Sequence, residues 1–425
     1  MKTHPTSPIR PQQILLLLST TVVTVCIALG IIRWWAPQLL GVPADLRLVQ
    51  VSDEVPPFFE GVFRREDFSS QAFIINDPFI QRAKPLMPAG DGVGPHDLLG
   101  FRNASIPHRA AIITIGDSQT YGNNAPLDKN WPSQLQRCVR GGESTLYNMS
   151  VGGWGAIEYL QIFEKALYLR PEIVVVAFYT GNDPYETFWQ AYAKDEFVAL
   201  RPNQDLADDD IPPLNYPPPA AEQIAVVFDD GTQTVFTPQL RFASNQDDPA
   251  IDAAYALMSE VARIITGAAA DHGVRALFTI IPTKELAFAR KVADQEKDLG
   301  YAPYDRLIAA ESARLDHLAD QIRAIPGAQY VDVLSPLQQA VLTQEAVYPL
   351  TSDGQPLAAG YGVIAASLAR EPVKLSNCYR MRHRRSWCCA VRRDSIAQVS
   401  GPTRSAPRTR PGEIFPRDRF LGRDT

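Results

Sequence analysis

Five short apolar runs, separated by segments of helical character, constrain the fold of this 425-residue chain more than any other feature. The third run reads IVVVAFY, without a charged residue, which is typical of a strand buried on both faces of a sheet. The expected strands are Arg109–Ile115, Leu146–Val151, Ile173–Tyr179, Ala276–Ile281 and Gln329–Val333. Because helical segments separate them, we expect an α/β fold with one parallel sheet that helices cover on both faces.

The helices and one interruption complete this pattern. The expected helices are Asn130–Val139, Gly155–Leu169, Ile251–Asp271, Tyr304–Ala324 and Leu357–Leu368. An acidic, proline-rich insertion occupies residues 184–250, and within it the sequence AVVFDDGTQTVF predicts a hairpin that turns at Asp230 and Gly231. The body therefore spans residues 109–370, and its active site is expected at the carboxyl ends of the strands.

The segments on either side of the body differ from it in composition. Residues 36–108 form a lead-in rich in proline and phenylalanine that is expected to pack on the body. Residues 371–425 hold 13 of the 41 basic and 5 of the 47 acidic side chains, so residues 1–370 keep 28 and 42, a net charge of −14. This charge argues against nucleic-acid binding by the main body, which would need a basic face. The basic tail is expected to be disordered, because it has little apolar surface to bury.

Residues 1–35 predict a cytoplasmic leader and a membrane anchor. Ile14–Ile32 is an uncharged run that, at about 1.5 Å per residue, spans roughly 28 Å, close to the hydrocarbon thickness of a bilayer. Arg10 precedes it and Trp34 and Trp35 follow it, which favours a cytoplasmic amino terminus. The alternative is a cleaved signal peptide, whose apolar region is usually shorter. We favour a single-pass anchor with the main domain outside the cytoplasm, in the periplasm or the extracellular space.

The cysteines predict neither a disulfide framework nor a metal site. Only Cys138 belongs to the body, where it is expected to be a free, buried residue of a helix. Cys378, Cys388 and Cys389 lie with His383 in the tail, whose sequence lacks the apolar periodicity of a folded zinc module. We therefore expect no bound metal.

The first strand leads directly into the sequence GDSQTYG at residues 116–122. A serine at the carboxyl end of a buried strand, with glycines that permit a tight turn, can present its hydroxyl to a cleft. The helix that follows would aim backbone N–H groups at a developing oxyanion. For this motif alone, an ordinary strand–helix turn with Ser118 as a cap is the alternative.

Two further motifs follow in order. Asn148 and Gly153 lie in NMSVGGWG after the second strand, and Gly181–Asp183 (GND) follows the third. Together the three motifs resemble blocks I, II and III of the SGNH (GDSL-type) hydrolases. Each motif is short, so the specificity of the resemblance lies in their order at the ends of successive strands. The resemblance covers about residues 95–370.

The resemblance implies both a fold and a reaction. The fold is a three-layer α/β/α sandwich with a five-stranded parallel sheet, flavodoxin-like in its layers. Ser118 would be the nucleophile that attacks an ester carbonyl. The backbone N–H groups of Ser118 and Gly153 and the side-chain amide of Asn182 would form the oxyanion hole. This chemistry requires neither a metal nor an organic cofactor.

The fourth motif departs from the family. The family places a histidine two or three residues after an aspartate, just before the last helix. Here Asp353 matches the aspartate, but Gln355 occupies the histidine position. A glutamine is neutral and cannot accept the serine proton as a general base, although it can still hydrogen-bond Ser118 or a substrate oxygen.

No other histidine has an expected position beside Ser118. His108 and His272 lie at the amino ends of strands, and His317 lies in the middle of a helix. His96, in the segment GPHDLLGF, is the one whose loop could cross the cleft, although we favour a structural role for it.

Lys284 lies in the segment IPTKE after the fourth strand, on the functional edge of the sheet. Similar segments occur in SGNH proteins linked to exopolysaccharide acetylation, so Lys284 is a candidate contact for an anionic or sugar ligand. The alternative is a helix start with Glu285 in its first turn.

These inferences favour a membrane-anchored, extracytoplasmic serine esterase, acyl hydrolase or O-acyltransferase. It would act through an acyl-Ser118 on an O-acylated small molecule, lipid or polysaccharide. The alternative is a catalytically inactive member of the family that binds acylated glycans or partners in an envelope complex, and Gln355 is the residue in its favour.

Overall fold

The computed structural model describes residues 24, 74–75, 82–90, 92–139, 145–211, 223–241, 248–343 and 346–370. The expected membrane anchor, Ile14–Ile32, lies outside these residues apart from Thr24, and so does the expected tail. Within the described ranges, no helix combines the length and the apolar character that a membrane crossing requires.

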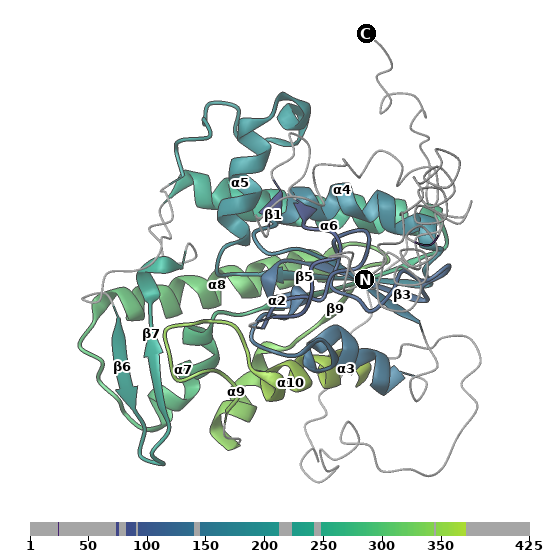
Figure 1. Ribbon diagram of the computed structural model, residues 1–425. Helices are drawn as coiled ribbons and strands as arrows, with labels where there is room; N and C mark the ends of the chain where they lie inside the picture. Colours follow the sequence, from purple (N-terminus) through teal and green to yellow (C-terminus); the bar gives the residue numbers. More distant parts are fainter. Residues whose placement is uncertain are drawn as a thin grey trace, which may run out of the picture. The chain divides into compact units, whose positions relative to one another are not determined.

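Five parallel strands form one sheet in the order β4-β3-β5-β8-β9, which confirms the predicted α/β fold (Figure 1). Their bounds are β3 Ile112–Gly116, β4 Leu146–Ser150, β5 Ile173–Tyr179, β8 Arg275–Ile281 and β9 Gln329–Val331. Because β3 lies between β4 and β5, the loops that follow these three strands are neighbours at one edge of the sheet. Those loops carry the three motifs.

The strand β5 shows why the sheet needs a cover on both faces. All seven of its residues are buried. Val174, Val176 and Phe178 belong to one hydrophobic core, and the alternate residues Val175 and Tyr179 belong to a second core. Full burial of such a side chain contributes about 1.5–3 kcal/mol, so both faces gain from a helical layer.

Helices cover both faces of the sheet (Figure 1). The first core contains buried residues of α4 Ala156–Ala166, α5 Asp183–Ala193, α6 Pro249–Asp271 and α8 Ala302–Ala324. The second core contains buried residues of α3 Trp131–Cys138, α7 Lys284–Asp294, α9 Leu334–Thr343 and α10 Ala358–Arg370. The result is the three-layer arrangement that the motifs imply.

Several short elements complete the described residues. The strands β1 Ile74–Ile75 and β2 Arg82–Ala83 pair antiparallel. Short 3-10 helices cover η5 Leu127–Lys129, η7 Leu167–Leu169, η8 Asp195–Leu200 and η10 Pro238–Leu240. The helix α9 was not predicted, because only Leu337, Ala340 and Val341 are buried in it and so narrow an apolar face gives a weak sequence signal.

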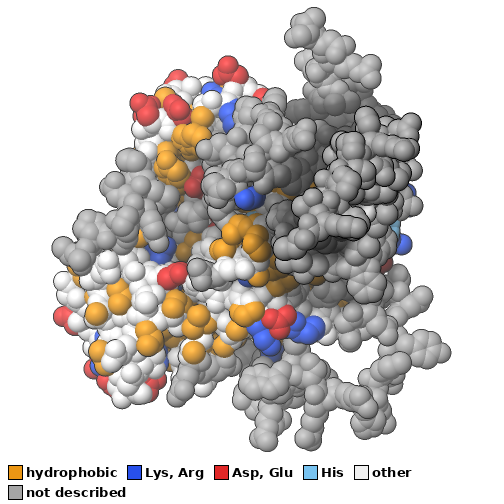
Figure 2. All heavy atoms as spheres, viewed as in Figure 1, with side chains coloured by type: hydrophobic (Ala, Val, Ile, Leu, Met, Phe, Trp, Pro, Cys, Tyr) orange, Lys and Arg blue, Asp and Glu red, His pale blue; other side chains and the backbone are white. Residues whose placement is uncertain are grey.

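The insertion contains the predicted hairpin but begins later than expected. The strands β6 Ile224–Val227 and β7 Gln233–Phe236 pair antiparallel, and Gly231 in their turn has a φ of 82°. The expected start at residue 184 falls inside α5, where a proline suits the first turn of a helix. The interruption of the layers therefore starts after α5. Asp208–Asp210 in this segment are exposed, and Figure 2 shows acidic side chains gathered over the part that follows α5.

The described part of the lead-in packs on the body, as expected. Leu99 and Phe101 are buried in the first core. The ring of Phe101 meets those of Tyr147 and Trp154 edge-on, at centroid distances of 6.0 and 6.2 Å.

The prediction of a free thiol in the body is wrong. Cys138 is disulfide-bonded. It is half-buried in the last turn of α3, so its sulfur is not enclosed in the core as the prediction assumed. The four other cysteines lie outside the described residues.

Candidate active site

Ser118 begins the short helix α2 (Ser118–Tyr121) directly after the carboxyl end of β3. Asp117 caps this helix, because its Oδ1 accepts a hydrogen bond from the backbone N–H of Gln119 at 2.9 Å. Only glycine fits before the turn, since a Cβ on Gly116 would collide with the side chain of Thr120. The strand, the cap and the glycine together place Ser118 at the edge of the sheet where the sequence expects it.

Two side chains hydrogen-bond the Ser118 hydroxyl. Gln355 Nε2 donates to Ser118 Oγ at 2.8 Å, across 237 residues of sequence. Ser118 Oγ donates in turn to Asp117 Oδ2 at 3.1 Å. Burial raises the pKa of Asp117 to about 7, although hydrogen bonds from Gln119 and Ser118 act to lower it. The serine proton thus faces a carboxyl group whose pKa lies near neutrality.

Asp353 and Gln355 lie together, but Asp353 does not orient the side chain of Gln355. Asp353 Oδ1 accepts the backbone N–H of Gln355 at 2.8 Å, and Oδ2 accepts Asn124 Nδ2, also at 2.8 Å. In a serine–histidine–aspartate site the carboxylate holds the imidazole of the base. Here both carboxylate oxygens fix the loop instead, and the Gln355 side chain has Tyr361 Oη beside its Oε1 at 3.5 Å.

The expected oxyanion donors lie in the loops after β4 and β5. Gly152 lies against the nucleophile, because a Cβ on it would be 3.5 Å from Ser118 Cβ. Gly153 follows it with a φ of 80°, which favours glycine. Asn182 caps α5 without a side-chain cap hydrogen bond. No described group hydrogen-bonds the Asn182 amide or the Gly153 N–H, and their role as oxyanion donors stays a prediction.

Two other motif residues support the loops rather than the reaction. Asn148 Oδ1 accepts the hydroxyls of Thr114 and Ser150 at 3.1 and 2.5 Å, and Asn148 Nδ2 donates to a backbone carbonyl of α2 at 3.1 Å. Asp183 Oδ2 accepts the backbone N–H of Tyr179 and the hydroxyl of Tyr159, both at 2.8 Å. Burial raises the pKa of Asp183 well above its usual value. These side chains tie neighbouring loops together beneath Ser118.

His96 has the structural role that the sequence favours. It is buried, with Nδ1 2.7 Å from the Lys84 carbonyl and Nε2 2.6 Å from Tyr121 Oη. Burial lowers the pKa of His96 to about 4. Both ring nitrogens are therefore engaged away from the Ser118 hydroxyl, whose partners are Asp117 and Gln355.

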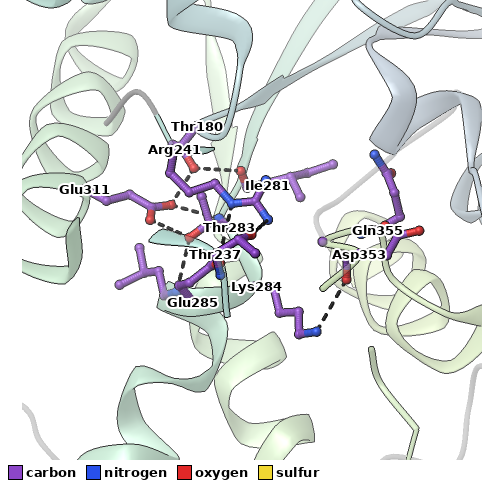
Figure 3. A network of polar contacts seen from close by, with 12 residues as sticks. Thr180, Thr237, Arg241, Ile281, Thr283, Lys284, Glu285, Glu311, Asp353 and Gln355 are labelled. Carbon is purple, nitrogen blue, oxygen red and sulfur yellow. Dashed lines mark hydrogen bonds and ion pairs between the residues drawn. The ribbon is translucent and has the colours of Figure 1, made fainter. Parts of the chain in front are cut away.

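A buried polar network beneath the Asp353–Gln355 loop was not predicted (Figure 3). Lys284 is fully buried and donates to backbone carbonyls, so the suggested contact with a ligand is wrong. Its alternative is confirmed, since α7 starts at Lys284 with Glu285 in the first turn. Arg241, from the insertion, pairs with Glu285 at 3.2 Å. The segment IPTKE is the signal for Lys284, whereas Arg241 lies in no motif.

A hollow of about 760 Å³ opens beside this loop. The residues that line it include Asn124, Leu127, Asp353 and Leu357 of the body and Val93 of the lead-in. Its lining is mainly apolar, with glycine backbone from the lead-in. Across the described ranges no three histidine, cysteine or acidic side chains gather as metal ligands.

The fold has the layers that the SGNH resemblance implies, and Gln355 hydrogen-bonds Ser118 from the position at which that family has its histidine. No family model matches the sequence, and no curated protein matches it.

Solved structures that match this chain include an acetyl-xylooligosaccharide esterase and a GDSL-like lipase. A variant of Axe2, an acetyl-xylooligosaccharide esterase from Geobacillus stearothermophilus, shares 13% identity over 63% of this chain and 96% of its own, with a TM-score of 0.35. TesA shares 12% over 61% and 98%, with a TM-score of 0.32. A GDSL-like lipase from Bacteroides thetaiotaomicron shares 11% over 60% and 84%, with a TM-score of 0.30. At such values the functional inference rests on the site itself.

Proposed function

We propose that the protein is an esterase or O-acyltransferase that forms an acyl ester on Ser118. The observation that carries this proposal is the 2.8 Å hydrogen bond from Gln355 to Ser118, which joins two motifs 237 residues apart, with Gly152 of a third motif packed against the same serine. An isolated capping serine would need no such partner.

The reaction would begin with attack of Ser118 Oγ on the carbonyl carbon of an ester. The serine proton passes to Asp117 Oδ2, its acceptor at 3.1 Å, while the Gly153 N–H and the Asn182 amide stabilise the oxyanion. Collapse of the tetrahedral intermediate expels the alcohol, which recovers the proton. Water or a second hydroxyl then attacks the acyl-serine along the same route. A pKa of about 7 suits Asp117 to this exchange at neutral pH.

The substrate is an O-acylated small molecule, lipid or polysaccharide. The hollow beside Asp353 does not include Ser118 in its lining, so it would receive a part of the substrate away from the reacting ester. The run Ile14–Ile32 would anchor the protein in the membrane, with the body outside the cytoplasm.

The test is turnover of short-chain aryl esters by the full-length protein and by Ser118→Ala. We expect wild-type hydrolysis to rise with pH through about 7, as Asp117 loses its proton, and an acyl adduct on Ser118 to be visible by mass spectrometry. The Ser118→Ala variant should lose both. Equal hydrolysis by the two proteins would reject the serine mechanism.

A second function has one observation in its favour. The Gln355 amide donates into Ser118 Oγ and cannot take up a proton, which suits a protein that binds acylated glycans or an envelope partner without turnover. Calorimetric binding of an acetylated oligosaccharide that stays intact for many hours would support this reading over the first.

A further inference from the structure

The buried side chain of Lys284 hydrogen-bonds the backbone of the loop that carries Asp353 and Gln355. Its exposure is 0%, and its Nζ donates to the carbonyls of Pro349, Thr351 and Asp353 at 3.0, 2.6 and 3.4 Å. An ammonium group has three N–H donors, so these three carbonyls use all of them. Figure 3 shows the side chain reaching from the start of α7 toward Asp353.

A second cation supports the same loop at the next residue. A Cβ on Gly354 would lie 2.6 Å from Arg241 Nη2, so the Arg241 guanidinium is packed directly against this glycine. Arg241 Nε is held by Glu285 Oε2 at 3.2 Å, and Glu285 Oε1 accepts the backbone N–H of Thr237 at 2.8 Å. Burial alone would raise the pKa of Glu285, but Arg241 lowers it below its usual value. A charged pair therefore stands beneath Gly354.

The loop connects these cations to the nucleophile. Asp353 accepts the N–H of Gln355, and the Gln355 side chain reaches Ser118 Oγ. A shift of the segment from Pro349 to Asp353 would therefore move the hydrogen-bond partner of the nucleophile. Misplacement by about 1 Å in an active site can cost about 100-fold in rate.

We propose that Lys284 is a positioning residue for acyl transfer at Ser118, and that its ammonium group holds the Asp353–Gln355 loop in register with the nucleophile. The expected effect of Lys284 on the rate of ester hydrolysis rests on the proposed function, but its role in holding the loop does not.

The proposal carries a pH dependence. Burial lowers the pKa of Lys284 to about 8, with Arg241 acting in the same direction and Glu285 and Asp353 opposing it. Arg241 faces Lys284 from the end of η10, Glu285 from its own helix and Asp353 from the loop. A neutral amine has two N–H donors instead of three, so one carbonyl loses its partner as the pH rises through about 8.

The experiment compares the full-length wild type with Lys284→Met and Lys291→Met. Lys291 is the matched control, because it is a buried lysine of the same helix that pairs with Asp230 at 2.7 Å and also donates to Thr232 and the Val341 carbonyl. None of these partners belongs to the loop.

Two readouts are taken on each protein: aryl ester hydrolysis from pH 6 to 10, and hydrogen exchange of the amides of residues 350–355. We expect Lys284→Met to lower kcat about 100-fold with KM little changed and to abolish the loss of activity above pH 8. Loop exchange, corrected for its intrinsic pH dependence, should quicken in Lys284→Met at every pH and in the wild type only above pH 8. Lys291→Met should match the wild type in both readouts, and Lys284→Arg should recover only part of the rate.

The two proposals fail separately. Unchanged loop exchange in Lys284→Met would overturn the positioning role, whatever the activity. Faster exchange in a wild type that never hydrolyses esters would keep the role of Lys284 in the loop and reject acyl transfer. An equal loss of kcat in Lys284→Met and Lys291→Met would show that a buried lysine of α7 only stabilises the fold, and would reject a specific positioning role for Lys284.

Discussion

The half-buried pair Ser118–Gln355 and the buried network beneath it differ in charge. Ser118 and Gln355 are half-buried and uncharged, and they are joined by one hydrogen bond. Lys284, Glu285 and Arg241 lie beneath them with little or no exposure and carry charges. The comparison teaches that the nucleophile and its amide partner are both neutral, with the carboxyl group of Asp117 beside them, whereas the fixed charges of the network lie where the loop needs support. The following changes test it, from the largest effect to the smallest.

Replacing the neutral partner of the nucleophile should have the largest effect. Gln355→His supplies a base in reach of Ser118 Oγ, and general-base catalysis contributes about 100- to 10,000-fold. We expect kcat for aryl esters to rise in that range and to follow the deprotonation of an imidazole near pH 6.5.

A matched control for this variant is Gln355→Asn, which stays neutral and is one methylene shorter. It should not gain activity. If Gln355→His is as slow as the wild type, residue 355 does not act on the Ser118 proton, and the proposed reactive role of the Ser118–Gln355 pair is rejected.

Removing an oxyanion donor should have the next largest effect. Asn182→Ala removes an amide that no described group engages, so a loss of about 100- to 1000-fold in kcat is expected with little change in thermal stability. Stopped-flow or steady-state hydrolysis in the Gln355→His background gives the measurement. Asn203→Ala, an exposed change in the insertion, should leave the rate intact, and an equal loss in both would remove Asn182 from the site.

A methyl group can be used to strain the supporting network directly. Gly354→Ala would push a Cβ against Arg241, and such overpacking costs about 1–3 kcal/mol of unfolding free energy. Gly267→Ala in α6 is the control, because a Cβ there meets nothing within 4 Å and alanine favours a helix. Denaturant unfolding should therefore show a lower unfolding free energy for Gly354→Ala and a higher one for Gly267→Ala, each relative to the wild type. A stable Gly354→Ala protein would mean that the loop yields easily.

An exposed charge should matter least. Asp230 is half exposed in the hairpin turn, and its hydrogen bond from Lys291 lowers the pKa of Asp230 to about 2. Because this pKa is depressed on folding, the stabilisation is present above about pH 4 and disappears as the pH falls through 2. We expect Asp230→Asn to lower the unfolding free energy by at most about 1 kcal/mol at pH 7. A loss as large as that of Gly354→Ala would contradict the ranking of buried over exposed charges.

The sequence predicted the sheet and the reacting groups for a common reason. An uninterrupted run such as Ile173–Tyr179 and a turn such as that around Asp230 and Gly231 are local signals, and the structure has β5 and the β6–β7 hairpin at those places. Ser118 and Gln355 were found because each lies in a short motif at the end of a strand or before a helix, and topology then brings them together.

The rest could not be predicted because it depends on burial and on long-range pairing. Nothing local in the segment IPTKE reveals that Lys284 is enclosed by three carbonyls from more than sixty residues further along the chain. Asp353 was placed correctly beside Gln355, but its use of backbone partners depends on Asn124. The disulfide of Cys138 was missed because the body holds no second cysteine with which to predict a pair.

The closeness of Arg241 to Gly354 also limits how this chain can change over generations. Arg241 comes from the insertion, a surface excursion between α5 and α6 of the same layer. Since it fills the space a side chain at position 354 would need, any lineage that trimmed the excursion would leave a gap and an unpaired Glu285 beneath the loop. The excursion and the loop would therefore have to be inherited, exchanged or lost as a unit. A protein that receives only one of them from this chain should have a poorly ordered loop.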